Sequence, residues 1–178
     1  MTAIRKVAVT GPESTGKSKL CRDLANHYKG LFVPEHARAY IDQLGRPYQQ
    51  DDILAIAKGQ LAIEQKIVDQ AGKMSAKPIV FCDTELIVTK VWSIHKYDSC
   101  DFWILDQIES NHYDLFLLCD VDLPWEPDMQ REHPELRSYF FDWYRLELEN
   151  YNFPYHVVMG DGENRLNNAV RLIDSALQ

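Results

Sequence analysis

The sequence predicts an α/β fold in which helices cover both faces of a parallel β-sheet. Short apolar runs alternate along the chain with longer segments of helical periodicity, which is the pattern of consecutive βαβ units. The first run leads directly into the glycine-rich loop Gly11–Ser18 and then into a helical pattern. The chain of 178 residues is long enough to bury a core of its own, so we expect a single domain over residues 1–178.

Five short apolar runs are expected to form the strands, since strands buried on both faces are continuously apolar. They are Lys6–Thr10, Leu31–Val33, Ile79–Cys82, Leu115–Cys119 and His156–Met159. The second run is very short and is followed by Pro34, which makes it the weakest of the five as a pattern.

Helical periodicity fills the segments between these runs. A first helix is expected from Ser18 to Tyr28 and a longer one from Asp51 to Met74, although Gly59 weakens the middle of the latter. Pro134 suits the first turn of another helix, and a last helix follows Asp161-Gly162. The apolar stripes of these helices predict core contacts.

The loop Gly11–Ser18 fits the pattern G-x-x-x-x-G-K-[ST] at every fixed position. Glycine permits backbone angles and close approaches that a Cβ would block, and a helix that starts at the loop directs amides at an anion. Lys17 can reach the terminal phosphates of a nucleoside triphosphate, and the Ser18 hydroxyl can bind Mg²⁺. An ordinary glycine-rich turn is the alternative. The expected nucleotide contacts are Gly11, Glu13, Ser14, Thr15, Gly16, Lys17, Ser18 and Leu20.

The net charge and the hydropathy of the chain restrict the kinds of molecule that it is expected to bind. The net charge of −8 argues against nucleic acid as the main partner, because a phosphate backbone requires a basic surface. No apolar stretch approaches the roughly 20 residues needed to cross a bilayer, and the N-terminus lacks a signal-peptide pattern. We therefore expect no membrane partner and a cytoplasmic location. The four cysteines lack metal-ligand spacing and predict buried thiols in a reducing compartment: Cys21, Cys82, Cys100 and Cys119.

Asp83 follows the third apolar run, at the edge of the sheet where ligands of parallel α/β folds bind. A carboxylate there can hold Mg²⁺ directly or through water. It could instead cap a helix opening at Thr84, and the two roles can coexist. Thr84 and Glu85 border the same crevice and are weaker candidates.

Glu35 and Arg38 follow the second run one helical turn apart. They suit a substrate pocket, with a base for a hydroxyl and a cation for an anionic group. An exposed ion pair at the start of a helix explains the same spacing equally well.

Residues 120–133 form an extended polar segment with no helical period, and such segments inside compact domains are usually functional. We call this segment the lid. A guanidinium delivered by a closing lid neutralises a transferring phosphoryl group, which suits Arg131 or, further along, Arg137. A solvated loop is the alternative. Trp125 could stack on a ring of the substrate or simply pin the lid to the core.

The combination of these motifs resembles the ribosylnicotinamide kinase domain of NadR-type proteins, in its standalone form. The resemblance spans nearly the whole chain and includes residues 160–165 after the last strand. The motifs that carry it are Gly11–Ser18, Pro34-Glu35-His36-Ala37-Arg38, Phe81-Cys82-Asp83-Thr84-Glu85, and Pro124-Trp125-Glu126-Pro127-Asp128 with Arg131. Met129 departs from the glycine that often follows the lid aspartate in this family.

The resemblance implies a three-layer P-loop NTPase fold with a five-stranded sheet of order 2-3-1-4-5. It implies ATP and Mg²⁺ as cofactors, and phosphorylation of nicotinamide riboside at its 5′-hydroxyl to give nicotinamide mononucleotide in NAD biosynthesis. By this resemblance Lys17 and Ser18 keep the phosphate-loop roles, Asp83 has the metal and acceptor-side role, and Arg131 is the lid cation. We expect Lys17, Glu35, Asp83 and Arg131 to be catalytic, and Ser18 and Asp83 to hold the metal. The riboside pocket would be formed by Glu35, Arg38, Thr84, Trp125 and Asp128, and Arg165 would border the adenine.

Two other functions fit the residues. One is a kinase of the same type with another nucleoside or small metabolite as acceptor. The other is a regulatory ATPase or ATP-binding module without metabolite turnover. The sequence leaves open which of Glu35 and Asp83 acts as the base, and it leaves open the oligomeric state.

Overall fold

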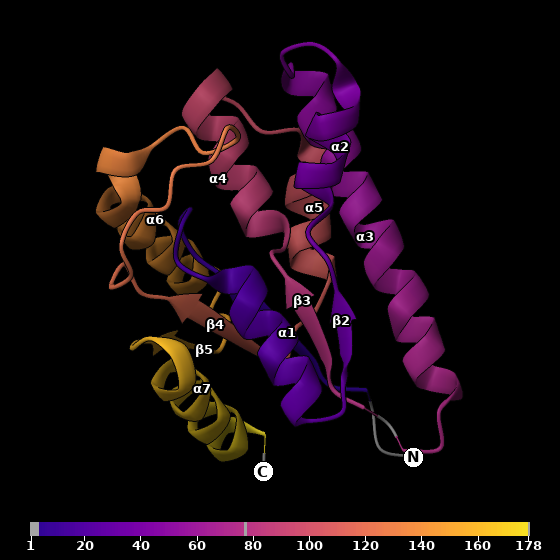
Figure 1. Ribbon diagram of the computed structural model, residues 1–178. Helices are drawn as coiled ribbons and strands as arrows, with labels where there is room; N and C mark the ends of the chain where they lie inside the picture. The colour runs from indigo at the N-terminus through magenta and orange to yellow at the C-terminus, as the bar shows by residue number, and fades with distance from the viewer. Residues whose placement is uncertain (1–3, 77, 178) are drawn as a thin grey trace.

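The computed structural model describes residues 4–76 and 78–177, and its centre is a parallel sheet of five strands (Figure 1). The strand order is β2-β3-β1-β4-β5, which confirms the expected order and fold class. The strands are β1 (Lys6–Thr10), β2 (Leu31–Val33), β3 (Val80–Asp83), β4 (Leu115–Cys119) and β5 (Tyr155–Val158). Three match the expected bounds; β3 begins and ends one residue later than expected, and β5 one residue earlier.

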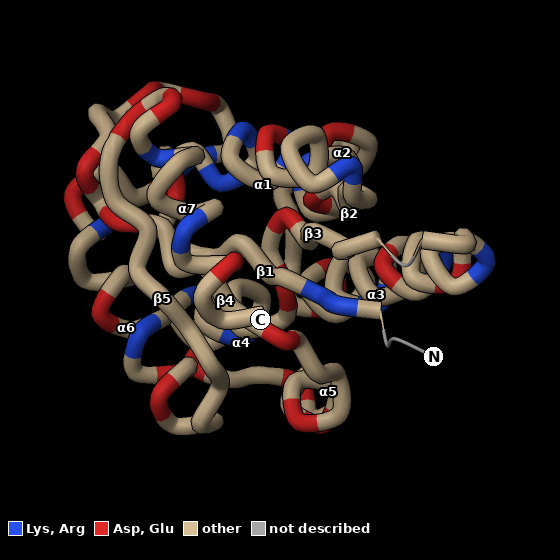
Figure 2. Tube along the Cα trace, turned by 90° about the horizontal axis from the view of Figure 1, so that it is seen from below, with Lys and Arg blue, Asp and Glu red and all other residues tan. Residues whose placement is uncertain are grey.

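Helices cover both faces of the sheet. α1 (Lys17–His27) and α7 (Gly162–Ala176) lie on one side of the strands, and α4 (Leu86–Tyr97) and α5 (Phe102–Ser110) lie on the other (Figure 2). α3 (Gln50–Lys73) and α6 (Arg137–Asn150) belong to the same layer as α4 and α5. α6 begins after the short 3₁₀ helix Pro134–Leu136.

α2 (His36–Leu44) packs against α3 beyond the end of β2. Gly59 of α3 lies at this contact, and a Cβ there would collide with the His36 ring. The glycine that weakened the helical pattern is thus explained by close packing of the two helices.

The core follows the alternation of side chains along the strands. Val7 and Val9 of β1 pack with α1 and α7, whereas Ala8 faces the layer of α3 to α6. Cys21, Cys82 and Cys119 are buried free thiols, and Cys100 is half-buried.

Charged residues of both signs are distributed around the two helical layers (Figure 2). Among the described residues, no helix combines the length and the apolar character that a membrane span requires.

Candidate active site

The phosphate loop connects β1 to α1 at the carboxyl end of the sheet. Gly11 has a φ of +133°, and a Cβ there would lie 2.9 Å from the carbonyl oxygen of Cys119, so the loop can pass β4 this closely only with glycine. Gly16 caps α1 with a left-handed φ of +73°. The Thr15 hydroxyl donates to the Pro12 carbonyl at 2.8 Å. The chain therefore curls into a closed concave loop at the N-terminus of α1, which is a geometry that binds anions.

Lys17 opens α1 and turns its side chain back over this loop. Its ammonium donates to the Pro12 carbonyl at 2.7 Å, so its charge lies within the concavity. The same charge lowers the pKa of both Glu35 and Asp83, although burial raises the pKa of each by more. The loop thus concentrates positive potential against two nearby carboxyl groups.

Asp83 ends β3 beside the phosphate loop and is only 2% exposed. Burial raises its pKa, and a hydrogen bond from Ser18 works against that rise. Within the described residues, Oδ1 of Asp83 is buried without a hydrogen-bond partner. An unpaired carboxylate oxygen and a neighbouring serine hydroxyl are both oxygen ligands, which Mg²⁺ prefers. Ser18 and Asp83 therefore fit the metal role expected of them.

The alternative that Asp83 caps a helix opening at Thr84 is wrong. α4 begins at Leu86, not at Thr84, and its cap is Glu85, whose carboxylate accepts from the Ile87 amide at 2.6 Å and from the Thr10 hydroxyl at 3.1 Å. Glu85 is buried and does not line the cavity, so it is not a crevice residue. The chain frees Asp83 by placing the cap two residues later.

Thr84 turns the chain between β3 and α4. It has a φ of +66°, which a β-branched residue rarely adopts and which costs about 1–3 kcal/mol. Its amide donates to the Val9 carbonyl at 3.1 Å, which extends the sheet pairing by one residue. Thr84 lines the cavity, as expected of a pocket residue.

Glu35 and Arg38 flank the start of α2, and both line the same cavity as the phosphate loop. Burial is the main cause of the raised pKa of Glu35. Among the described residues, its carboxylate has no hydrogen-bond or ion-pair partner. Arg38 bonds to Asp128 of the lid at 2.9 Å rather than to Glu35, so the alternative of a local surface ion pair is wrong.

The lid is irregular chain that lines part of the cavity and is held at several points. The Ser14 hydroxyl accepts from the Glu126 amide at 2.8 Å, and the Arg131 guanidinium lies 3.5 Å from the same hydroxyl. Arg131 also donates to the Glu126 carbonyl and lines the cavity. Met129 is fully exposed and does not have a positive φ, so glycine is not required there. These bonds favour an ordered lid over a solvated loop.

Trp125 lies outside the residues that line the cavity. The Arg137 guanidinium carbon stands 5.7 Å from the centre of its ring, and Arg137 also donates to the carbonyls of Leu123, at 2.8 Å, and Ser14, at 3.3 Å. The structure therefore favours Trp125 as a pin for the lid over Trp125 as a stacking surface. Arg137 joins the lid to the phosphate loop and is not a second free lid cation.

Two expected nucleotide contacts are placed elsewhere. Leu20 is 3% exposed and packs in the core with α7, so its expected role is wrong. Arg165 is 4% exposed and lies outside the cavity lining. Its guanidinium donates to the Thr15 carbonyl at 3.0 Å and to Asp122 at 2.6 Å. Arg165 thus supports the phosphate loop from behind.

The cavity has a volume of about 610 Å³ and extends from the phosphate loop to a second, more aromatic end. The residues that line this second end were not identified as pocket residues from the sequence. They include Tyr48, Val88, Thr89, Trp92, His95, Lys96, His133, Phe140 and Tyr144. The lining residues on α4 recur at helical spacing soon after Asp83, and this pattern in the sequence could have identified them as pocket residues. Tyr48, in the connection between α2 and α3, has no such signal.

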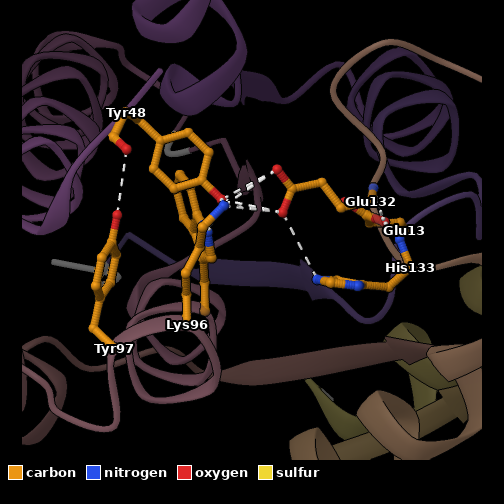
Figure 3. Close-up of polar contacts among 7 residues, drawn as sticks. Glu13, Tyr48, Lys96, Tyr97, Glu132 and His133 are labelled. Carbon is orange, nitrogen blue, oxygen red and sulfur yellow. Dashed lines mark hydrogen bonds and ion pairs between the residues drawn. The ribbon is translucent and has the colours of Figure 1, made fainter.

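A polar cluster closes this second end (Figure 3). The Tyr48 hydroxyl accepts from the Lys96 ammonium at 2.5 Å and from the Trp92 indole at 3.0 Å, and it donates to Glu132 of the lid at 3.2 Å. Lys96 also lies 3.3 Å from the Glu132 carboxylate. The carboxylate of Glu13 accepts from the amides of Glu132, at 3.1 Å, and His133, at 3.3 Å. The cluster thus joins the lid to three separate parts of the chain.

The model of a family described as AAA domain matches residues 6–165. The chain belongs to this family. The curated relatives of the chain include the trifunctional NAD biosynthesis/regulator proteins NadR of Salmonella typhimurium and of Escherichia coli. Each is 29% identical over 132 residues, which are 70% of this chain and 30% of the relative. The chain therefore matches less than a third of the length of these proteins.

Solved structures agree on the fold. A NadR protein in complex with NR superposes with a TM-score of 0.80 at 22% identity, over 97% of this chain and 50% of that chain. A NadR protein in complex with NAD and AMP-PNP gives 0.77 at 23% identity, over 97% and 49%. A thymidylate kinase from Ehrlichia chaffeensis gives 0.65 at 16% identity, over 99% and 100%. These structures show the same fold, and the 29% identity to the curated NadR proteins bears out the resemblance found in the sequence.

Proposed function

We propose that this chain is an ATP-dependent kinase that phosphorylates the 5′-hydroxyl of nicotinamide riboside and so forms nicotinamide mononucleotide for NAD biosynthesis. The observation that carries the proposal is the continuous cavity between the phosphate loop and the aromatic end, with Glu35 on its wall. Such a cavity can hold a polyphosphate and a nucleoside end to end, which in-line transfer requires. The names of the NadR relatives and the solved NadR complex with NR support nicotinamide riboside as the acceptor.

In the proposed reaction the phosphate loop amides and Lys17 hold the β- and γ-phosphates. Arg131 lies over the same loop and neutralises charge that develops on the transferring group. Ser18 and Asp83 would hold Mg²⁺, which when bound offsets the charge of the phosphates. The lid excludes water and so protects ATP from hydrolysis.

Glu35 is the better candidate for the general base. It lines the cavity with a carboxylate that has no partner among the described residues, whereas Asp83 lies behind the cavity lining beside Ser18. Burial raises the pKa of both groups, which strengthens either one as a base, so the choice depends on which carboxylate lines the cavity. We therefore assign the acceptor hydroxyl to Glu35 and the metal to Asp83.

The aromatic end would receive the base of the acceptor. Trp92 and Tyr144 line it, and Tyr48 closes its rim. Aromatic walls suit a flat ring, whether neutral or cationic. Arg38 lines the cavity and pairs with Asp128, which lies outside the lining, so we propose that Arg38 contacts the ribose and that Asp128 holds it in place.

The test is a coupled assay of ADP release with a panel of ribosides, using the whole chain. We expect nicotinamide riboside to stimulate release, and Lys17→Ala to abolish it. Lys66→Ala, an equal loss of charge on the exposed face of α3, is the matched control and should retain the full rate. Stimulation by a different nucleoside alone would identify another acceptor. ATP binding without stimulation by any riboside would favour a regulatory module.

A further inference from the structure

We infer that Glu13 is the residue that positions the lid cation, acting through backbone amides to hold Arg131 over the phosphate loop. This inference rests on the proposed kinase function and deepens it. The sequence assigns Glu13 to nucleotide binding because of its place in the loop motif. The structure turns its side chain to the lid instead (Figure 3).

A carboxylate is an unexpected group in a phosphate loop. Its charge repels a polyphosphate, and like charges that share a site disfavour binding. The neighbouring loop positions offer amides, a hydroxyl and the Lys17 ammonium, all of which suit an anion. The negative charge of Glu13 therefore needs a function other than contact with the nucleotide.

The bonding of Glu13 supplies that function. Its Oε2 atom accepts from the amides of Glu132, at 3.1 Å, and His133, at 3.3 Å, which are the two residues directly after Arg131. Bonds from backbone amides to a carboxylate are about twice as strong as neutral ones. Two of them on consecutive residues fix the local chain direction, and so fix where the Arg131 side chain leaves the backbone.

Arg131 occupies the place that this anchoring dictates. Its guanidinium is 3.5 Å from the Ser14 hydroxyl and bonds to the Glu126 carbonyl. Loss of the Glu13 carboxylate would remove the two bonds directly after Arg131. The segment would keep the contacts of Glu132 with Tyr48 and Lys96 and the bond of Gln130 to Asp42. The lid would still close, but the guanidinium would no longer be fixed against the loop.

The experiment is a double-mutant cycle between Glu13→Ala and Arg131→Ala in the whole chain, with kcat, KM for ATP and amide hydrogen exchange of residues 129–136 as readouts. We expect Glu13→Ala to lower kcat by about 10- to 100-fold with little change in KM for ATP, since misplacing a catalytic group by about 1 Å has an effect of this size. In the Arg131→Ala background the same change should alter kcat less than about twofold, because residues that act as a unit are not additive.

Two further variants sharpen the result. Glu13→Gln retains an oxygen that accepts amide bonds and should recover part of kcat. Glu135→Ala removes an equal charge from the exposed 3₁₀ helix after the lid and should leave kcat and exchange unchanged.

Additive effects of the two substitutions would overturn the inference. So would unchanged exchange at residues 129–136 in Glu13→Ala, whatever the activity. A wild-type chain inactive on every riboside would refute the proposed riboside kinase function. Exchange is measured without turnover, so it would still decide whether Glu13 anchors the lid.

Discussion

Substitution of Arg165 separates support of the phosphate loop from direct contact with the nucleotide. The guanidinium donates to the carbonyls of Thr15, at 3.0 Å, and Asp120, at 3.2 Å, and forms an ion pair of 2.6 Å with Asp122. It also donates to the Gly160 carbonyl at 2.5 Å. Arg165→Met keeps much of the side-chain volume and removes all of these donors.

The size of the effect follows from this geometry. Each buried carbonyl that loses its donor costs about 1–3 kcal/mol, and removing one partner of a buried ion pair costs about 3–5 kcal/mol. The Asp122 side chain is 29% exposed, so water would solvate part of its freed charge. We therefore expect a loss of about 4 kcal/mol in the free energy of unfolding. For a chain of 178 residues this corresponds to a fall in Tm of roughly 10 °C.

The assay combines thermal and urea unfolding with calorimetric titration of ATP and Mg²⁺. The control is Arg171→Met, which removes an exposed arginine from the same helix and should change Tm by less than about 2 °C. The expected pattern for Arg165→Met is a large loss of stability, with weaker ATP binding that follows from the disturbed Thr15 segment. An unchanged Tm together with lost ATP affinity would refute this reasoning and would support the nucleotide contact expected from sequence.

Three further predictions concern single residues. Glu35→Gln should lower kcat by about 100-fold or more without weakening ATP binding. Because the pKa of Glu35 is raised, the acid limb of the wild-type pH–rate profile should lie above the usual glutamate range. An unshifted acid limb would contradict the assignment of Glu35 as the base. Burial raises the pKa of Glu85 from 4.5 to about 7, so its contribution to stability is full below pH about 4.5 and is lost as the pH rises through 7. Glu85→Gln should flatten this pH dependence of the free energy of unfolding between pH 5 and 8, by about 3 kcal/mol at most; an unaltered slope would speak against burial as the cause. Gly11→Ala should cost at least about 1–3 kcal/mol of stability and abolish ATP binding, because its Cβ would lie 2.9 Å from the Cys119 carbonyl oxygen; normal titration heat would argue against the close approach.

The fold could be predicted from local patterns because each strand is a short apolar run and each expected helix carries a clear stripe. The strand order was implied by the family resemblance, and the pairing of β1 with both β3 and β4 confirms it. α5 was not identified separately from sequence. The start of α4 was placed at Thr84 instead of Leu86, because capping by Glu85 depends on the left-handed turn at Thr84.

The sequence by itself determined the phosphate loop and the carboxylate at the end of β3, because both depend on residues close together in the chain. Only the tertiary structure decided what the longer side chains do. Arg165 contacts Thr15 across 150 positions, Arg38 pairs with Asp128 across 90, and Glu13 reaches the lid amides across 119 and 120. Such partners are chosen by which segments the sheet order brings together, and periodicity carries no information about contacts at that separation.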